Sequence, residues 1–348
     1  MAAFKLGKEL ISRNAKCFVI AEIGHNHQGE LDKAVNMIHI AAACGANAIK
    51  FQKRNNKKLY TQKMYNQPYD NENSFGSTYG KHRDALEFGF DDFKELMKVA
   101  KKNHVEFMCT AFDFDSADFL EELGIKSFKI ASGDLTSLPL IEYIAKKNKP
   151  MFISTGASTL EEVKETYKLV TSLNKKICFF HCIATYPSEY NQLNLNVIRT
   201  YLKELPEAVI GYSSHENGIL GPNIAYMLGA TVIETHFTLN HSWKGTDHKF
   251  SLEPQGLQKM IRDLRRIDLL LGNGEKRILE EEKSARQKMG KSLFYVHNLK
   301  SSSVLKKNDI CIKSPGGYLK TNNFNLVVGK KLIKNVVKED PINLSDLI

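Results

Sequence analysis

The sequence predicts a (β/α)8 barrel, and three observations support this fold class. Eight short apolar runs with strand character alternate with segments of helical spacing in the first 271 residues. The connections between them are short, with one exception, and polar residues follow each run. Eight such units close into a barrel whose active site lies at the carboxyl ends of the strands. An open doubly wound sheet is the competing fold, but no G-x-G-x-x-G motif opens a helix.

The first two strands are expected at residues 17–22 and 47–52, and residues 31–44 between them have the apolar spacing of a helix. The polar loop before that helix carries His25 and His27. Each of these histidines is a surface group, a group that orients a substrate, or a ligand.

Residues 54–85 are polar, rich in tyrosine and without a steady apolar period. A structureless loop of that length is uncommon in a compact domain and is usually functional. We therefore expect this segment to be a lid or a binding loop.

Six further units follow with short connections. Their strands are expected at residues 105–110, 126–131, 151–154, 177–183, 208–212 and 231–236, and their helices at residues 91–103, 115–123, 138–147, 158–171, 193–204 and 217–228. A last helix is expected at residues 255–271, which gives a barrel domain at residues 1–271.

The rest of the chain predicts a linker and a small second domain. Residues 272–290 are rich in Glu, Lys and Arg and indicate a linker with some helical character. Residues 291–348 hold short β-like runs separated by turn signals, so we expect a small β-rich module. A module of this size buries too little apolar surface to carry the barrel's chemistry, and docking on another surface would stabilise it.

The composition is that of a soluble globular protein with a formal net charge of +10. The lysines are dispersed in pairs without interleaved aromatic residues, so a solvated surface is favoured over a nucleic-acid interface. Six cysteines lie far apart without a C-x-x-C pair, which favours reduced thiols. No secretory or membrane-spanning segment fits the sequence, and a cytoplasmic protein is expected.

Polar residues stand at or just beyond the end of every predicted strand. In a barrel they converge on one cavity, although they lie far apart along the chain. They are Glu22, Lys50, Gln52, Thr110, Lys129, Ser132, Ser154, His181, Tyr186, Ser213, Ser214, His215 and His236.

Lys50 and Lys129 lie within otherwise apolar strands, where a charge is costly to bury unless it meets an anion. They predict a carboxylate or phosphate ligand. The neutral donors around it would be Thr110, Ser132, Ser154 and Ser213. The alternative is that either lysine pairs with a core glutamate such as Glu22 or Glu234.

His215 and His236 end two neighbouring strands, which brings them close enough to bind one divalent ion, with water and substrate completing its shell. Taken alone, either one is more often a hydrogen-bonded structural histidine. Glu22 is a carboxylate in a lysine-lined cavity and is suited to orienting or deprotonating a water or hydroxyl. Asp247 either reaches the same cavity or caps the last helix region together with Ser251.

Several motifs occur in one order along the chain. They are A-E-I-G-H-N-H-Q-G (21–29), I-K-F-Q-K (49–53), T-Y-G-K-H-R (78–83), F-K-I-A-S-G-D (128–134), I-S-T-G (153–156), H-C-I-A-T-Y-P (181–187), G-Y-S-S-H-E-N-G (211–218), E-T-H-F-T-L (234–239) and W-K-G-T-D-H-K-F-S-L-E-P (243–254). With these motifs the chain resembles the sialic acid synthases, or N-acylneuraminate synthases, over nearly its full length.

The resemblance implies condensation of phosphoenolpyruvate with an N-acetylmannosamine-type sugar, giving a nine-carbon 2-keto sugar acid and free phosphate. It implies that His215 and His236 hold a divalent ion, Mn²⁺ with Mg²⁺ or Co²⁺ as alternatives, which polarises the open-chain aldehyde. Glu22 would help to activate the water added at C2. The resemblance assigns the phosphoenolpyruvate anions to Lys50, Gln52, Thr110, Lys129, Ser132, Ser154 and Ser213, and the sugar to Tyr186 and Asp247.

The tail from Lys291 resembles the antifreeze-like (SAF) module of this family, which covers the partner subunit's active site. This implies a domain-swapped homodimer. Ser314 stands where many bacterial members have an arginine that reaches the sugar's acyl group, and Ala184 and Thr185 replace a more polar residue. The T-Y-G-x-H and W-K-G-x-D-H segments resemble the animal-type enzymes, which use a 6-phosphorylated sugar. The acceptor is therefore open between N-acetylmannosamine, its 6-phosphate and a diacetamido-dideoxy sugar leading to a legionaminic or pseudaminic acid.

Two other hypotheses compete with this one. The first is a phosphoenolpyruvate synthase that makes eight- or seven-carbon keto acids from pentose or tetrose phosphates, and the tail module and the W-K-G-T-D-H segment argue against it. The second is a sugar-binding or ice-binding protein without turnover. The intact set Glu22, Lys50, Lys129, His215 and His236 argues against that reading.

Overall fold

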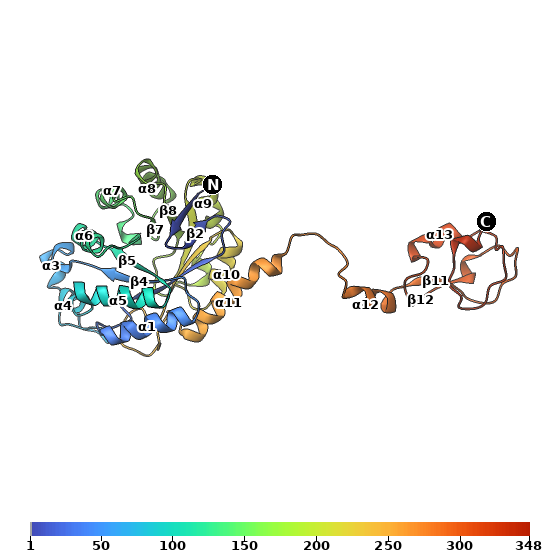
Figure 1. Cartoon of the computed structure of the whole chain (residues 1–348), viewed down its shortest axis with the longest axis horizontal. Helices are drawn as coiled ribbons and strands as arrows, with labels where there is room; N and C mark the ends of the chain where they lie inside the picture. The colour runs from blue at the N-terminus through green and yellow to red at the C-terminus, as the bar shows by residue number, and fades with distance from the viewer. Residues whose placement is uncertain (1) are drawn as a thin grey trace. The chain divides into compact units, whose positions relative to one another are not determined.

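The computed structural model describes residues 2–348 and confirms the predicted barrel (Figure 1). Eight parallel strands close in the order β10-β3-β4-β5-β6-β7-β8-β9. Their bounds are β3 Phe18–Gly24, β4 Ala48–Lys53, β5 Glu106–Ala111, β6 Phe128–Ile130, β7 Met151–Ser154, β8 Ile177–His181, β9 Val209–Ser214 and β10 Val232–His236. All these bounds lie close to the predicted ones.

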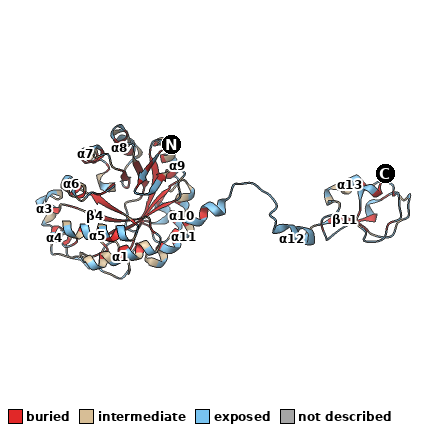
Figure 2. Ribbon diagram, viewed as in Figure 1, coloured by how far each residue is buried: buried red, intermediate tan, exposed pale blue. Residues whose placement is uncertain are grey.

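Helices cover the outside of the barrel, and their exposed faces contrast with the buried strands in Figure 2. They are α1 Leu31–Ala43, α5 Phe90–Lys102, α6 Phe114–Glu122, α7 Leu138–Lys146, α8 Leu160–Leu173, α9 Val197–Glu204, α10 Leu220–Met227 and α11 Pro254–Leu271. The start of α8 shows why helices begin where they do. The Thr159 side chain accepts a hydrogen bond from the Glu162 amide, and the Glu162 carboxylate accepts one from the Thr159 amide.

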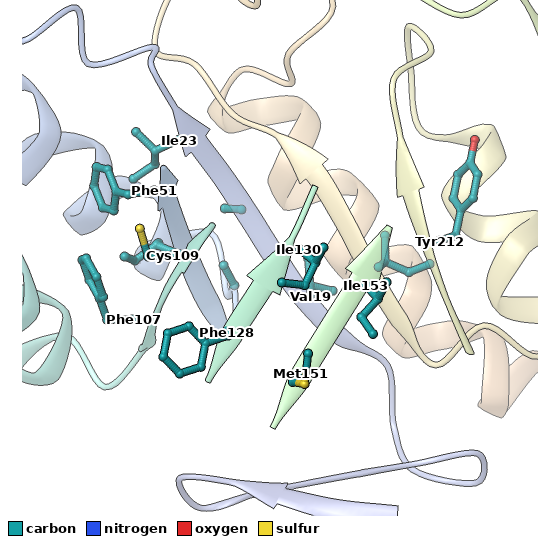
Figure 3. Packing of buried hydrophobic residues seen from close by; sticks show 14 of the residues in the cluster. Val19, Ile23, Phe51, Phe107, Cys109, Phe128, Ile130, Met151, Ile153 and Tyr212 are labelled. Carbon is teal, nitrogen blue, oxygen red and sulfur yellow. The ribbon is translucent and has the colours of Figure 1, made fainter. Parts of the chain in front are cut away.

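Side chains alternate along each strand between the helices and the barrel interior. Outward residues such as Val19, Phe51 and Ile153 pack against the helices in the largest core cluster (Figure 3). Inward residues form a second buried cluster, which includes Ile20, Met108 and other apolar side chains from the strands. The interior is therefore filled with apolar groups toward the amino ends of the strands, and inward polar groups lie toward the carboxyl ends.

An N-terminal hairpin that the sequence analysis did not predict completes this inner cluster. Strands β1 Ala3–Leu6 and β2 Glu9–Ser12 are antiparallel, and Gly7 turns the chain between them with φ of +58°. Phe4, Leu6 and Ile11 are buried among the inward residues of the barrel strands. The hairpin thus packs against the amino-terminal end of the barrel interior.

Replacing Phe4 with alanine is expected to lower the free energy of unfolding by about 3 kcal/mol, because it removes a buried aromatic ring and leaves a cavity. The Phe4 ring lies 5.7 Å from that of Phe152 in an edge-to-face arrangement. Urea unfolding followed by circular dichroism would measure the change. Leu10→Ala in the same hairpin is the matched control, since Leu10 is 54% exposed. Equal losses in both variants would contradict the packing role of Phe4.

Residues 54–85, which were expected to form a lid or a binding loop, contain regular structure. The segment contains three short helices, α2 Asn56–Leu59, α3 Gln62–Tyr65 and α4 Tyr79–Asp84. Thr61 and Thr78 cap the last two by accepting hydrogen bonds from backbone amides. Helices of four to six residues are too short to show an apolar period, so sequence patterns could not predict them.

Residues Gly272–Ile348 form a second compact unit. It contains α12 Glu282–Met289, the antiparallel strands β11 Ser292–Tyr295 and β12 Ile310–Lys313, and α13 Phe324–Val327. Short 3₁₀ helices lie at Ser132–Asp134 and Tyr190–Gln192 in the barrel and at Lys307–Asp309, Thr321–Asn323 and Leu344–Asp346 in this unit. The hydrophobic core of the unit Gly272–Ile348 includes Leu293, Tyr295, Leu305, Leu332 and Ile342.

All six cysteines are free thiols, as predicted. Within residues 2–348, no helix is both long enough and apolar enough to cross a membrane.

Candidate active site

A cavity of about 410 Å³ opens at the carboxyl ends of the barrel strands. Twelve of the residues predicted to form the site line it, namely Glu22, Lys50, Gln52, Thr110, Lys129, Ser132, Ser154, Tyr186, Ser213, His215, His236 and Asp247. They come from all eight strands or from the segments that follow them, so closure of the barrel brings them together. Asp247 therefore reaches the cavity, while its backbone carbonyl accepts a hydrogen bond from Ser251.

The prediction that His181 and Ser214 join this cavity is wrong. The His181 ring is buried, and its Nε2 is 2.7 Å from the Leu193 carbonyl oxygen. Ser214 donates a hydrogen bond to the backbone carbonyl of Glu234. Their strand neighbours Phe180 and Ser213 point inward, so alternation turns His181 and Ser214 toward the outside.

Lys50 pairs with Glu22, as the alternative prediction for this lysine stated. Its Nζ is 2.8 Å from Glu22 Oε2 and 3.6 Å from a Glu234 oxygen, and it donates a hydrogen bond to Thr110. Burial acts to lower the pKa of Lys50, but the two carboxylates outweigh it and raise that pKa. Gln52 donates to the other Glu22 oxygen at 2.7 Å, so Glu22 is fixed from two sides.

Lys129 has a different environment. Its ammonium donates to the Ile130 carbonyl and to Ser154, and among the described residues it forms no ion pair. Burial lowers its pKa, and the attraction of Glu234 opposes this only in part. Hydroxyls of Ser132 and Ser213 line the same cavity. A buried ammonium among neutral hydroxyls is suited to an anionic ligand.

His215 and His236 face each other, with ring centroids 5.4 Å apart. His215 Nδ1 lies 2.7 Å from the Ile183 carbonyl oxygen, so this nitrogen carries the proton and Nε2 keeps a free lone pair. Burial, assisted by His236, lowers the pKa of His215 to about 4, which leaves the ring neutral at pH 7. Neutral imidazoles with available lone pairs are the form that binds divalent metals.

His236 has a buried Nδ1 without a hydrogen-bond partner, and an Asp247 carboxylate oxygen lies 3.6 Å from it. Unpaired buried nitrogens are rare, and a metal ion or substrate group would satisfy this one. Across residues 2–348, no group of three or more His, Cys, Asp and Glu side chains is arranged to hold a metal. The two imidazoles are the nitrogen ligands that this part of the cavity offers, and an ion held by them would keep open positions for water and substrate.

Four further charged or titratable residues line the cavity, namely His25, Arg54, Arg83 and Glu234. The sequence indicated His25 as one possible substrate-orienting group and Glu234 as one possible partner of a lysine, but it indicated neither arginine. Alternation could have found Glu234, because it lies two residues before His236 and faces the same side of β10. Arg54 and Arg83 lie at the ends of the segment with short helices, where no periodic signal reports side-chain direction.

Comparison with known proteins gives one consistent result. Residues 37–276 match the model of the NeuB family. The N-acetylneuraminate-9-phosphate synthase of Homo sapiens is 40% identical over 328 residues, which cover 94% of this chain and 91% of that protein. The N,N'-diacetyllegionaminic acid synthase of Campylobacter jejuni is 36% identical over 331 residues, or 94% of this chain and 98% of that protein.

A solved structure shows the same likeness. The crystal structure of N-acetylneuraminic acid (sialic acid) synthetase from Leptospira borgpetersenii, in complex with citrate, matches with a TM-score of 0.70 and 32% sequence identity. The match covers 81% of this chain and 94% of that one.

Proposed function

The chain belongs to the NeuB family, and we propose that it joins phosphoenolpyruvate to an N-acylated amino sugar, releasing phosphate and forming a nine-carbon 2-keto acid. The observation that carries this proposal is the set of charged and metal-binding side chains that share one cavity. An ammonium without an anion, Lys129, shares that cavity with two imidazoles and the Glu22 carboxylate. One substrate must supply an anion, and the other must supply a group that a Lewis acid can polarise.

Phosphoenolpyruvate would bind at Lys129 and the hydroxyls around it. The ammonium provides charge-assisted hydrogen bonds, and Thr110, Ser132, Ser154 and Ser213 provide neutral ones. Lys50 is already paired with Glu22, so it contributes less attraction to the anion than Lys129. This arrangement would hold the enol carbon C3 toward the acceptor.

The reaction forms a carbon–carbon bond at C3 and a carbon–oxygen bond at C2, converts the protonated aldehyde oxygen into a hydroxyl group, and breaks the bond between C2 and the phosphate oxygen. C3 of phosphoenolpyruvate attacks the aldehyde carbon of the open-chain sugar, and water adds to C2 as the electron pair of the double bond moves into the new bond. Glu22 would take the proton from that water, and Lys50 lies beside it at 2.8 Å. The intermediate then loses phosphate from C2, which becomes the keto group.

A divalent ion is part of the proposal, with Mn²⁺ as the first choice and Mg²⁺ or Co²⁺ as alternatives. His215 and His236 would hold it, and when bound it would supply a Lewis acid for the aldehyde oxygen. Tyr186, whose ring centroid lies 4.3 Å from that of His215, and Asp247 would contact the sugar from the two sides of this pair.

Phosphate release from phosphoenolpyruvate tests the function. Purified protein with Mn²⁺ would be assayed with N-acetylmannosamine, its 6-phosphate, a diacetamido-dideoxy sugar, arabinose 5-phosphate and erythrose 4-phosphate, and each product would be identified by mass spectrometry. Release is expected with at least one amino sugar and is expected to stop on addition of a chelator. Turnover of a pentose or tetrose phosphate alone would instead support a shorter-chain keto acid synthase, and no turnover at all would favour a binding protein.

We also propose that the unit Gly272–Ile348 covers the active site of a second copy of the chain, in a domain-swapped homodimer located in the cytoplasm. The support is the resemblance of this unit to an antifreeze-like module and its organisation as a compact unit with its own core. Sedimentation of the full chain is expected to give a dimer. Truncation after Gly290 is expected to raise the Michaelis constant for the sugar about tenfold or more. An unchanged constant, or a monomeric full chain, would contradict this role.

A further inference from the structure

Two arginines line the active-site cavity without an opposite charge. Arg54, which directly follows β4, is 7% exposed, and Arg83 lies on α4. No carboxylate of residues 2–348 lies within ion-pair distance of either guanidinium. Arg54 instead donates to the Gln52 side-chain oxygen at 2.6 Å, and Arg83 donates to the Tyr79 hydroxyl at 3.0 and 3.2 Å.

The neighbouring lysine shows what is unusual about this pair. Lys53, next to Arg54 in the chain, is paired with Glu87 at 3.0 Å. A buried cation ordinarily has such a partner, because transfer of an unpaired charge from water is costly. The two guanidiniums also repel each other, and this repulsion acts with burial to lower the pKa of Arg54. The cost of keeping both charges here is offset if a ligand supplies the anion.

The His25 ring lies between the two arginines, and its contacts leave one hydrogen-bond donor without an acceptor. Its Nε2 is 3.1 Å from one Arg54 nitrogen, and its Nδ1 is 3.2 Å from one Arg83 nitrogen. Burial and both arginines lower the pKa of His25 well below its usual value, so the ring is neutral. A neutral imidazole has one acceptor nitrogen and one N–H group, and guanidinium nitrogens only donate. One of the two contacts therefore sets donor against donor, and an anion accepting from both groups would relieve it.

We propose that Arg54, Arg83 and His25 form a binding site for a phosphate group on the terminal carbon of the amino-sugar acceptor. This inference rests on the proposed function and names its acceptor as a sugar phosphate. Arginine donates through a planar fork that suits phosphate oxygens. Two such forks on one side of a cavity match a dianionic phosphomonoester better than a neutral hydroxyl.

The position of the arginines in the barrel favours the acceptor over phosphoenolpyruvate. Lys129 and Ser154 lie on β6 and β7, whereas Arg54 and Arg83 lie in the segment that follows β4. The reacting aldehyde must lie near Glu22 and the histidine pair, and the two arginines line the same cavity, so the far end of the acceptor can reach them. Gln52 connects the two regions, since it donates to Glu22 and accepts from Arg54.

Steady-state kinetics with paired acceptors test this inference. The wild-type enzyme is expected to show a kcat/KM at least about 100-fold higher for the 6-phosphorylated amino sugar than for the same sugar without phosphate. Arg54→Gln and Arg83→Gln are each expected to lower kcat/KM for the phosphorylated sugar about 10- to 100-fold. For the unphosphorylated sugar the change should stay within about threefold, and the Michaelis constant for phosphoenolpyruvate should not change.

The controls separate this role from a structural one. Arg266→Gln on α11 removes an exposed arginine and should leave all constants unchanged. Arg83→Lys keeps the charge and should recover part of the preference for the phosphorylated sugar, and thermal unfolding would show whether each variant is folded. A wild-type preference for the unphosphorylated sugar would overturn the proposal even if both arginine variants failed to fold. So would equal losses with both acceptors, or a rise only in the phosphoenolpyruvate constant. No phosphate release with any amino sugar would instead refute the proposed function itself.

Discussion

Lys129→Met is expected to lower kcat/KM for phosphoenolpyruvate by about 1,000-fold while leaving the protein as stable as the wild type or more stable. The first effect follows because the variant loses the ammonium that is free to meet the substrate's anions, which corresponds to about 4 kcal/mol of binding energy. The second follows because burial lowers the pKa of Lys129 in the folded state. Keeping the side chain protonated at pH 7 therefore costs folding free energy, and methionine has no such cost.

Two measurements check this result together. Phosphate release at varied phosphoenolpyruvate gives the kinetic loss, and urea unfolding gives the stability. Lys126→Met is the matched control. Lys126 lies just before β6, is exposed, and pairs with Glu106 on β5. A Lys129 variant that loses stability by several kcal/mol and keeps its affinity for phosphoenolpyruvate would show that the lysine has a structural role.

The sequence predicted the barrel and most of the cavity because both depend on short-range patterns. Apolar runs with β-branched residues marked the strands, and the strand ends marked the cavity, since a closed barrel brings every strand end to one place. The assignment of Glu22, Lys50 and Lys129 to that place needed only the strand count. His181 was assigned wrongly because its position at a strand end was considered without the alternation that turns it outward.

Other features depend on contacts that no local pattern encodes. The N-terminal hairpin is stabilised by packing on the end of the barrel interior, which only the folded barrel provides. Its residue Phe4 contacts Phe152, which lies nearly 150 positions away in the sequence. The ion pair between Lys50 and Glu22 depends on the distance between two side chains, which the sequence pattern does not report. Arg54 and Arg83 meet at His25 because three short helices fold the segment between them back on the barrel.

His236→Ala is expected to reduce turnover to less than about one thousandth of the wild-type value without unfolding the protein. The side chain ends β10 with a buried Nδ1 that has no hydrogen-bond partner, so truncation breaks no hydrogen bond of that atom. Stability should therefore change little, and turnover should be lost instead, because catalytic residues of barrel enzymes lie at the carboxyl ends of the strands. The Asp247 carboxylate, which lies 3.6 Å from His236 Nδ1 in the wild type, would remain but would not replace the missing imidazole.

Binding of Mn²⁺ distinguishes the metal role from other roles of His236. Electron paramagnetic resonance or calorimetric titration should show weaker Mn²⁺ binding to the variant by about 100-fold or more, since one of two protein ligands is gone. His39→Ala, which removes an exposed histidine from α1, should leave both binding and turnover unchanged. Loss of turnover with unchanged Mn²⁺ affinity would place the ion elsewhere and leave His236 as a contact to the sugar. Turnover close to that of the wild type would remove the histidine pair from the mechanism, because His215 alone cannot fix the position of an ion against the aldehyde.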